Sequence, residues 1–272
     1  MKVTIKDFVP KHTFDCGQCF RWEVQPDESF IGVANGQAVR IKADGDCVDI
    51  DGITREDYDS FWAKYLDVQR DYSAVKKAVN INETMNKSIK FGYGIRILRQ
   101  DFFETLISFI ISQRSSIPKI KSCVNKLCAL CGEKIEFEGK TYYSFPAPEK
   151  IAALSEEDLR ALGVGYRAPY ILKAAQAVAN GEIDADILEK ADTADARKKL
   201  LALYGVGDKV CDCVLLFSLG KYDLFPSDVW IKRVMAEEFD AKDAKSAGET
   251  QFGLYSGFAQ QYLFYWRKYN NV

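Results

Sequence analysis

The chain has 272 residues, of which 47% are hydrophobic and 28% charged, a length that suits about two globular domains. Its formal net charge of −2 argues against a protein that coats nucleic acid by bulk positive charge. The single histidine, His12, excludes most triad and multi-histidine metal chemistry. A nucleophile or base is therefore expected among Asp, Glu, Lys, Cys and Tyr.

Residues 1–52 alternate between apolar and polar side chains, as half-buried strands do. Dipeptides that tolerate positive φ, and so suit tight hairpins, separate the alternating runs: Asn35-Gly36, Asp44-Gly45 and Asp51-Gly52. We therefore predict an antiparallel meander of four or five short strands.

From Thr54 onward the apolar residues follow helical spacing. Capping boxes, which satisfy the free N–H groups at a helix start, are expected at Thr54 with Asp57 and at Ser155 with Asp158. The irregular stretch 132–148 suits either a loop or a small hairpin. The predicted fold class is α+β, with an antiparallel sheet domain and flanking helices over 1–85 and an all-helical domain over 86–272.

No apolar run approaches the roughly 20 residues that a membrane-spanning helix needs, and the N-terminus lacks the apolar core of a signal peptide. We expect a cytoplasmic protein with reduced thiols and no membrane partner. Cys123, Cys128 and Cys131 follow part of a ferredoxin-like spacing, but the next cysteine is Cys211. Without a fourth ligand nearby, we interpret them as small apolar helix residues and predict no metal and no cofactor.

The segment 196–219 reads as two short helices joined by Gly205-Val206-Gly207. Glycines permit a tight turn and a close approach of backbone to a ligand. The N–H groups that open the second helix, with the positive end of the helix dipole behind them, suit a DNA phosphate. An ordinary helical hairpin with a glycine cap fits these residues equally well.

Two residues that follow the turn, Lys209 and Asp228, indicate a catalytic site. Lys209 lies in the first turn of the second helix, where the dipole disfavours a cation and favours the nucleophilic neutral amine. Asp228 follows Pro226-Ser227 and can cap the next helix while one oxygen faces the same cleft. Each residue alone suits a solvated lysine or a plain N-cap, whereas the pair around a hairpin favours a catalytic site.

Several segments in chain order carry a family resemblance. Residues 205–213 with 226–229 resemble the helix–hairpin–helix DNA glycosylases. Three further segments narrow the resemblance to the 8-oxoguanine DNA glycosylase branch: 16–22, 94–101 leading into 108–110, and 257–264. The resemblance implies an N-terminal sheet domain like the TATA-binding protein and a helical glycosylase domain.

The resemblance also implies roles for individual residues. The lysine at the Lys209 position attacks C1′ of the damaged nucleotide and forms a Schiff base, and the aspartate at the Asp228 position supports that step. Gly17 offers its carbonyl to the N7 hydrogen that only the oxidised guanine carries. The residues matching Cys213 and Phe264 sandwich the flipped base, and the one matching Gln260 reads its Watson–Crick edge. A core role for Cys213 and Phe264, and a solvated one for Gln260, are the alternatives.

This chain departs from the family at residues expected to contact DNA. Tyr166 matches a wedge tyrosine and Arg167 an arginine that reads the orphaned base. Arg114 replaces an asparagine that fills the vacated space, and Lys119 replaces a second arginine. Because lysine lacks the planar fork of arginine, we expect a weaker preference for cytosine opposite the lesion. The hairpin residues Gly205, Val206 and Gly207 complete the expected DNA contacts.

The leading hypothesis is a monomeric base-excision enzyme that flips 8-oxoguanine out of double-stranded DNA, excises it and nicks the abasic strand. A glycosylase for other damaged bases and a non-catalytic DNA-binding module are the alternatives. In a prokaryote, such an enzyme is expected at the nucleoid. Between Lys87 and Lys121 seven basic residues stand against two acidic ones, so we expect a narrow basic face and a shallow salt dependence.

Overall fold

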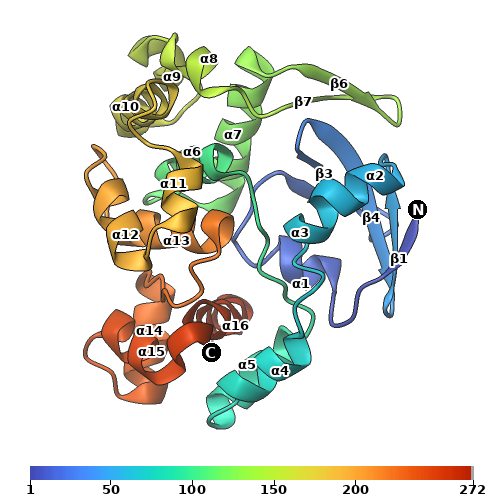
Figure 1. Cartoon of the computed structure of the whole chain (residues 1–272), viewed down its shortest axis with the longest axis vertical. Helices are drawn as coiled ribbons and strands as arrows, with labels where there is room; N and C mark the ends of the chain where they lie inside the picture. Colours follow the sequence, from blue (N-terminus) through green and yellow to red (C-terminus); the bar gives the residue numbers. More distant parts are fainter. Residues whose placement is uncertain (271–272) are drawn as a thin grey trace.

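The computed structural model describes residues 1–270 and confirms the predicted α+β class. Five antiparallel strands form the N-terminal sheet in the order β1-β5-β4-β3-β2 (Figure 1). Their bounds are β1 Lys2–Thr4, β2 Trp22–Val24, β3 Phe30–Ala34, β4 Gln37–Asp44 and β5 Cys47–Asp51. Strands β2 to β5 form the predicted meander, but β1 pairs with β5 across the sheet. The N-terminal amine helps to hold it there, since it donates to the carbonyl of Ile50 at 2.6 Å.

Short helical segments cover one face of the sheet. They are α1 Pro10–Phe14, α2 Arg55–Asp57 and α3 Ala63–Tyr65. The capping box of Thr54 and Asp57 is confirmed. The helix that it starts widens into a π-helical turn over Tyr58–Trp62. In the core beneath, the rings of Phe14 and Trp22 stack with centroids 3.9 Å apart.

Up to residue 270, the rest of the chain is mostly helical apart from one hairpin, as predicted. The helices are α4 Tyr72–Val79, α5 Glu83–Phe91, α6 Phe102–Ser112, α7 Ile117–Cys131, α8 Pro148–Ala152, α9 Glu156–Ala161, α10 Ala168–Ala179, α11 Ala185–Lys190, α12 Thr193–Leu201, α13 Asp208–Leu219, α14 Val229–Phe239, α15 Ala244–Phe252 and α16 Ser256–Tyr269. Among the described residues, no helix is both long and apolar enough to span a bilayer.

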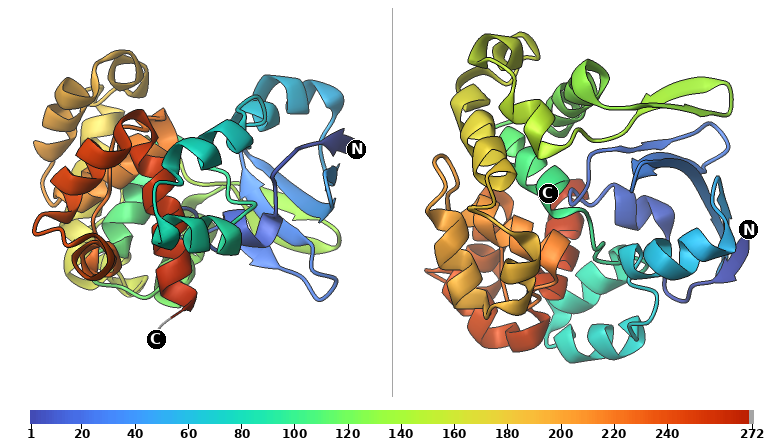
Figure 2. Two further views of the ribbon diagram at one scale, coloured as in Figure 1. Left: turned by 90° about the horizontal axis from the view of Figure 1, so that it is seen from below. Right: turned by 45° about the horizontal axis from the view of Figure 1, so that its top comes forward.

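The irregular stretch 132–148 contains a hairpin of β6 Lys134–Phe137 and β7 Lys140–Tyr143. This arm reaches from the helical part across to the N-terminal sheet (Figure 2). Glu138 at its tip pairs with Arg40 of β4, and the ring of Phe137 packs where a Cβ on Gly52 would lie. The hairpin therefore fastens the two parts of the molecule to each other.

Helix α16 runs back against the N-terminal part beside α5 (Figure 1). Gln261 donates to the carbonyl of Cys16 at 2.5 Å, which holds the segment around Gly17 against the helical part. Val79 and Met85 belong to the same apolar cluster as Leu263. Residues 1–85 and 86–272 remain our proposed domains, with α4 and α5 linking them.

The lone histidine joins α1 to the loop before α6 and predicts an acid sensitivity. His12 Nδ1 accepts the N–H of Gly94 at 3.2 Å, and burial, with a smaller contribution from Lys11, lowers the pKa of His12 below 6.5. The unfolded chain therefore takes up this proton first. We expect stability to fall as pH drops below 6.5 toward the lowered folded pKa, by at most about 1.4 kcal/mol per pH unit.

His12→Asn is the matched variant, since asparagine offers an acceptor that does not titrate in this range. Urea unfolding at several pH values between 7.5 and 5 should show a smaller loss of unfolding free energy for His12→Asn than for the natural chain. Parallel curves for the two proteins would contradict a role of His12 in acid sensitivity.

Candidate active site

The predicted hairpin is present between α12 and α13. Gly205 has φ of +83°, and a Cβ there would lie 2.2 Å from the ring of Tyr170. Glycine is therefore required both by the turn and by the close packing. Gly207 is the N-cap of α13, whereas Val206 is 7% exposed. Because the Val206 side chain is buried and glycine has none, all three turn residues expected to contact DNA can offer only their backbone.

Helix α13 carries Lys209 into a cavity. Its amine donates to Ser112 Oγ at 3.3 Å and lies 4.8 Å from the ring centroid of Phe109. Both partners belong to α6, which packs against α13. The lysine is thus half-buried in a mixed environment of one hydroxyl and one aromatic face, and its amine points toward the cavity that the other predicted residues line.

Asp228 reaches the same cavity from the start of α14. Its Oδ1 accepts the N–H of Ile231 at 2.9 Å, the N-cap bond expected from the sequence. The carboxylate borders the cavity together with Lys209. Local capping therefore fixes the orientation of Asp228, because the same bond that starts the helix holds the side chain at the cavity wall.

The remaining predicted pocket residues also line this cavity. Gly17 has φ of +82°, and a Cβ there would lie 2.9 Å from Phe264 Cε1. Burial raises the pKa of Cys213 to about 12, so this thiol is a neutral wall of the pocket. Gln260 Oε1 is buried and finds no hydrogen-bond partner within residues 1–270, which marks it as an acceptor available to a ligand.

The cavity has a volume of about 50 Å³, which holds only a few water molecules. The ring of Phe264 lies at this cavity and packs on Gly17. A larger cavity of about 780 Å³ lies between the sheet and helical parts, but its lining includes none of the predicted site residues. The chemistry of the lining, rather than its size, therefore identifies the candidate site.

The other predicted DNA contacts lie on three segments: Arg114 on the loop after α6, Lys119 in the first turn of α7, and Tyr166 and Arg167 on the short helical turn before α10. Tyr166 is 48% exposed, and the guanidinium of Arg167 lies 4.5 Å from its ring centroid. Arg114 is exposed with φ of +49°, and Lys119 is exposed beside Gly163. None of these side chains lines the cavity. This arrangement suits residues that contact the DNA strand around a base pocket.

Sequence reasoning missed Gln113, which ties the loops together. Its side-chain amide donates to the backbone carbonyl of Gly205 at 3.0 Å, and its backbone carbonyl accepts from Arg167 Nε at 2.8 Å. Glutamine at this position has no motif or spacing that signals such a role. Only the folded chain brings the segments that carry Gln113, Arg167 and Gly205 together.

The expected basic face is narrower than the sequence count suggested. Arg96 is 2% exposed and donates to the backbone carbonyl of Lys6 at 2.7 Å. Arg99 pairs with Glu189 at 2.6 Å, far from the hairpin at the opposite end of α6. These two cations are therefore structural and do not add to a DNA-facing charge.

Comparison with known proteins gives two family matches. A family model described as 8-oxoguanine DNA glycosylase, N-terminal domain, matches residues 1–106. A second, described as HhH-GPD superfamily base excision DNA repair protein, matches residues 107–259. A probable N-glycosylase/DNA lyase of Methanothermobacter thermautotrophicus is 33% identical over 210 residues, which cover 68% of this chain and 66% of that relative, just under two thirds.

Two solved structures are similar over nearly the whole chain. MBOgg1, in complex with a low affinity DNA ligand, is 42% identical with a TM-score of 0.97, covering 100% of this chain and 96% of its own. The 8-oxoguanine glycosylase/lyase of Clostridium acetobutylicum, solved with double-stranded DNA containing cytosine opposite 8-oxoG, is 40% identical with a TM-score of 0.96. That match covers 98% of this chain and 94% of its own.

The contact between Gly17 and Phe264 predicts the effect of adding one methyl group. Gly17→Ala would force a side chain into the left-handed region and push the new Cβ against the ring. We expect the unfolding free energy to fall by about 1–3 kcal/mol. Gly36→Ala is the control, because Gly36 has φ of +68° but no atom within 4 Å of its Cβ position. Urea unfolding should show the larger loss for Gly17→Ala; equal losses would contradict the contact.

Proposed function

Because the chain belongs to the 8-oxoguanine DNA glycosylase family of the HhH-GPD superfamily, we propose that it excises 8-oxoguanine from duplex DNA and nicks the resulting abasic strand. The observation that supports this most directly is the convergence on one cavity of an amine, a carboxylate and a set of side chains and backbone groups suited to contact a base. Lys209 and Asp228 supply the first two, and Gly17, Cys213, Gln260 and Phe264 supply the third.

The chemistry follows from the amine and the carboxylate. The neutral amine of Lys209 attacks C1′ of the damaged nucleotide, the C1′–N9 bond breaks, and the base leaves with the bonding electrons and takes up a proton. The carboxylate of Asp228 stabilises positive charge that develops on the sugar. Opening of the sugar ring gives a Schiff base between C1′ and the lysine nitrogen. Loss of a C2′ proton then expels the 3′ phosphate, which nicks the strand.

Selectivity is proposed to rest on one hydrogen bond. The carbonyl of Gly17 would accept the N7 hydrogen of 8-oxoguanine, whereas N7 of guanine is an acceptor and would leave the carbonyl unpaired. The buried Oε1 of Gln260 offers an acceptor for the amide or amino hydrogens on the Watson–Crick edge. Both contacts require the base to be flipped out of the stack, which Tyr166 would support as a wedge.

The partner is double-stranded DNA that contains the lesion. The hairpin would bind a phosphate through the N–H groups at the start of α13, and Arg114, Lys119 and Arg167 would contact the strand around the vacated position. We propose that the enzyme acts as a monomer in the cytoplasm, or at the nucleoid in a prokaryote, and that it needs no cofactor.

Borohydride trapping tests the proposed nucleophile. With duplex DNA that carries one 8-oxoguanine, the natural chain should form a covalent complex, because borohydride reduces the Schiff base to a stable amine. Lys209→Gln should form none and should still bind the duplex. Binding by the natural chain without trapping or strand cleavage would instead favour a non-catalytic DNA-binding module.

Asp228→Asn separates the catalytic role of Asp228 from its capping role. Asparagine caps a helix about as well as aspartate. The free energy of unfolding of Asp228→Asn, measured by thermal unfolding, should therefore stay within about 0.5 kcal/mol of that of the natural chain. Excision at saturating enzyme should slow about 100-fold, because the charge that supports the transition state is lost. Asp228→Ala, the control, should lose about 1 kcal/mol of stability as well. An unchanged rate in a folded Asp228→Asn would contradict the proposal.

The base opposite the lesion tests the role of Lys119. Because lysine cannot form the two parallel hydrogen bonds of an arginine, excision opposite cytosine and opposite adenine should proceed at similar rates. Lys119→Arg should raise the preference for cytosine by about 1–3 kcal/mol. Lys126→Arg, an exposed change on the same helix, is the control and should leave the ratio unchanged. Strict dependence on cytosine in the natural chain would refute this prediction.

A further inference from the structure

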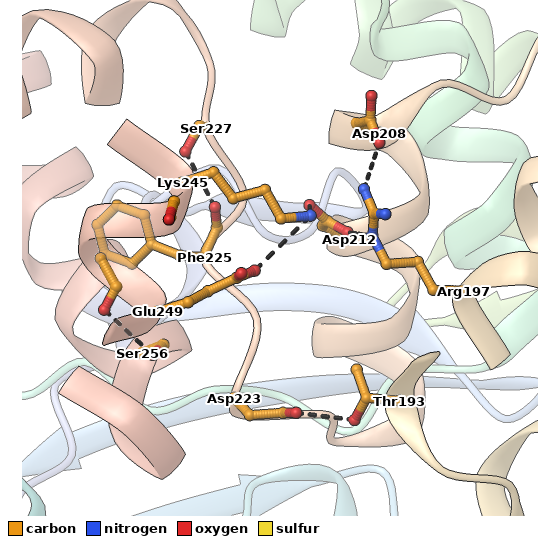
Figure 3. Close-up of polar contacts among 12 residues, drawn as sticks. Thr193, Arg197, Asp208, Asp212, Asp223, Phe225, Ser227, Lys245, Glu249 and Ser256 are labelled. Carbon is orange, nitrogen blue, oxygen red and sulfur yellow. Dashed lines mark hydrogen bonds and ion pairs between the residues drawn. The ribbon is translucent and has the colours of Figure 1, made fainter. Parts of the chain in front are cut away.

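A buried carboxylate lies on α13 immediately behind the proposed nucleophile. Asp212 is 1% exposed, and a charge at that depth is stable only when it is paired and hydrogen-bonded. Its Oδ1 accepts from Arg197 Nε at 2.6 Å, and its Oδ2 accepts from Lys245 Nζ at 2.5 Å. The two cations come from α12 and α15, on either side of α13 (Figure 3).

Helical spacing connects this group to the cavity. Lys209 and Cys213 are four residues apart and line the cavity wall. Asp208 and Asp212 form the neighbouring row, and both pair with Arg197. Since the two rows belong to one rigid turn of helix, any rotation of α13 that moves Asp212 also moves the amine of Lys209.

Lys245 belongs to helix α15, which also packs against the loop that leads to Asp228. Lys245 opens helix α15, whose later residues Gly248 and Phe252 clamp the ring of Phe225. That ring is parallel to Phe252 within 10°, and a Cβ on Gly248 would lie 2.4 Å from it. Phe225 is fully buried three residues before Asp228. Helix α15 therefore contacts both elements that carry the proposed catalytic pair.

We propose that the ion pair between Asp212 and Lys245 sets the position of the Lys209 amine relative to the Asp228 carboxylate. Neither residue touches the cavity, so both are positioning residues. The pair joins α13 to α15, and α15 in turn fixes the approach to Asp228 through Phe225. Because covalent attack on C1′ depends steeply on the placement of the nucleophile, a shift of about 1 Å costs about 100-fold in rate. This inference rests on the proposed function.

Lys245→Met and Asp212→Asn test the pair, since each removes one charge and nearly preserves side-chain size. For both we expect single-turnover excision of 8-oxoguanine at saturating enzyme to slow about 10- to 100-fold. The Kd for the lesion duplex should change less than about threefold, because the residues that contact DNA are untouched. Lys245→Arg, which restores a cationic donor, should recover most of the rate.

Lys76→Met is the matched control for a merely structural ion pair. Lys76 pairs with Asp7 at 2.8 Å, and each side chain is 10% exposed, but the pair lies outside the cavity. At a single assay temperature well below the unfolding midpoint of every variant, Lys76→Met should keep the natural excision rate. An equal loss of rate in Lys76→Met, or a natural rate in folded Lys245→Met, overturns the proposal.

Asp212→Glu covers the case in which the charge-removing variants do not fold. It keeps the charge and lengthens the side chain by one methylene, which pushes α13 away from α15. We expect a folded protein whose excision slows about tenfold or more with an unchanged Kd, and a natural rate overturns the proposal. Borohydride trapping by the natural chain distinguishes the proposed function from the positioning role of the ion pair. Its absence contradicts the proposed function, whereas trapping with undiminished rates in the variants contradicts only the positioning role.

Discussion

Burial of helix α13 is the constraint on which the site depends. Its residues from Val210 to Leu219 are all buried, so the helix is a core element that emerges only at its first turn. A core helix cannot rotate without disturbing its packing on every side. The turn that emerges carries both the phosphate-binding backbone and Lys209, and the packing of the core therefore fixes the direction in which the amine points.

The second half of the cavity is brought to α13 from the N-terminal part by buried hydrogen bonds. Gln18 donates to the carbonyls of Thr13 at 2.9 Å and Arg96 at 2.8 Å and accepts from the N–H of Leu98 at 2.9 Å. Together with the bond from Gln261 to Cys16, these hold Gly17 in its left-handed conformation. A pocket shared by two parts of the chain thus depends on amide groups that sit beside it rather than in it.

The sequence was informative where function and local structure coincide. Capping residues such as Ser155 and Asp228 were identified because the cap is a local hydrogen bond within three residues. The hairpin was identified because a Gly-x-Gly turn between two helices is a local signal, and Gly205 in particular requires its positive φ and its close packing on Tyr170. Gln113 and Asp212 were missed as connecting residues, because their partners are distant in the chain and no spacing rule links them. Arg96 was misjudged for the same reason, since charge counted along a chain says nothing about which side chains the fold buries.

The amino-acid sequence by itself determined the α+β class, the helix boundaries set by caps, and the types of residue at the site, because each of these depends on neighbours a few residues away. Only the tertiary structure decided that Gly17, Lys209, Asp228 and Phe264 border one cavity, and that the ring of Phe264 packs on Gly17. It also decided that β1 pairs with β5 and that α15 touches both proposed catalytic elements. These are contacts between segments far apart in the chain, and the packing of a common core, which no local pattern encodes, brings them together.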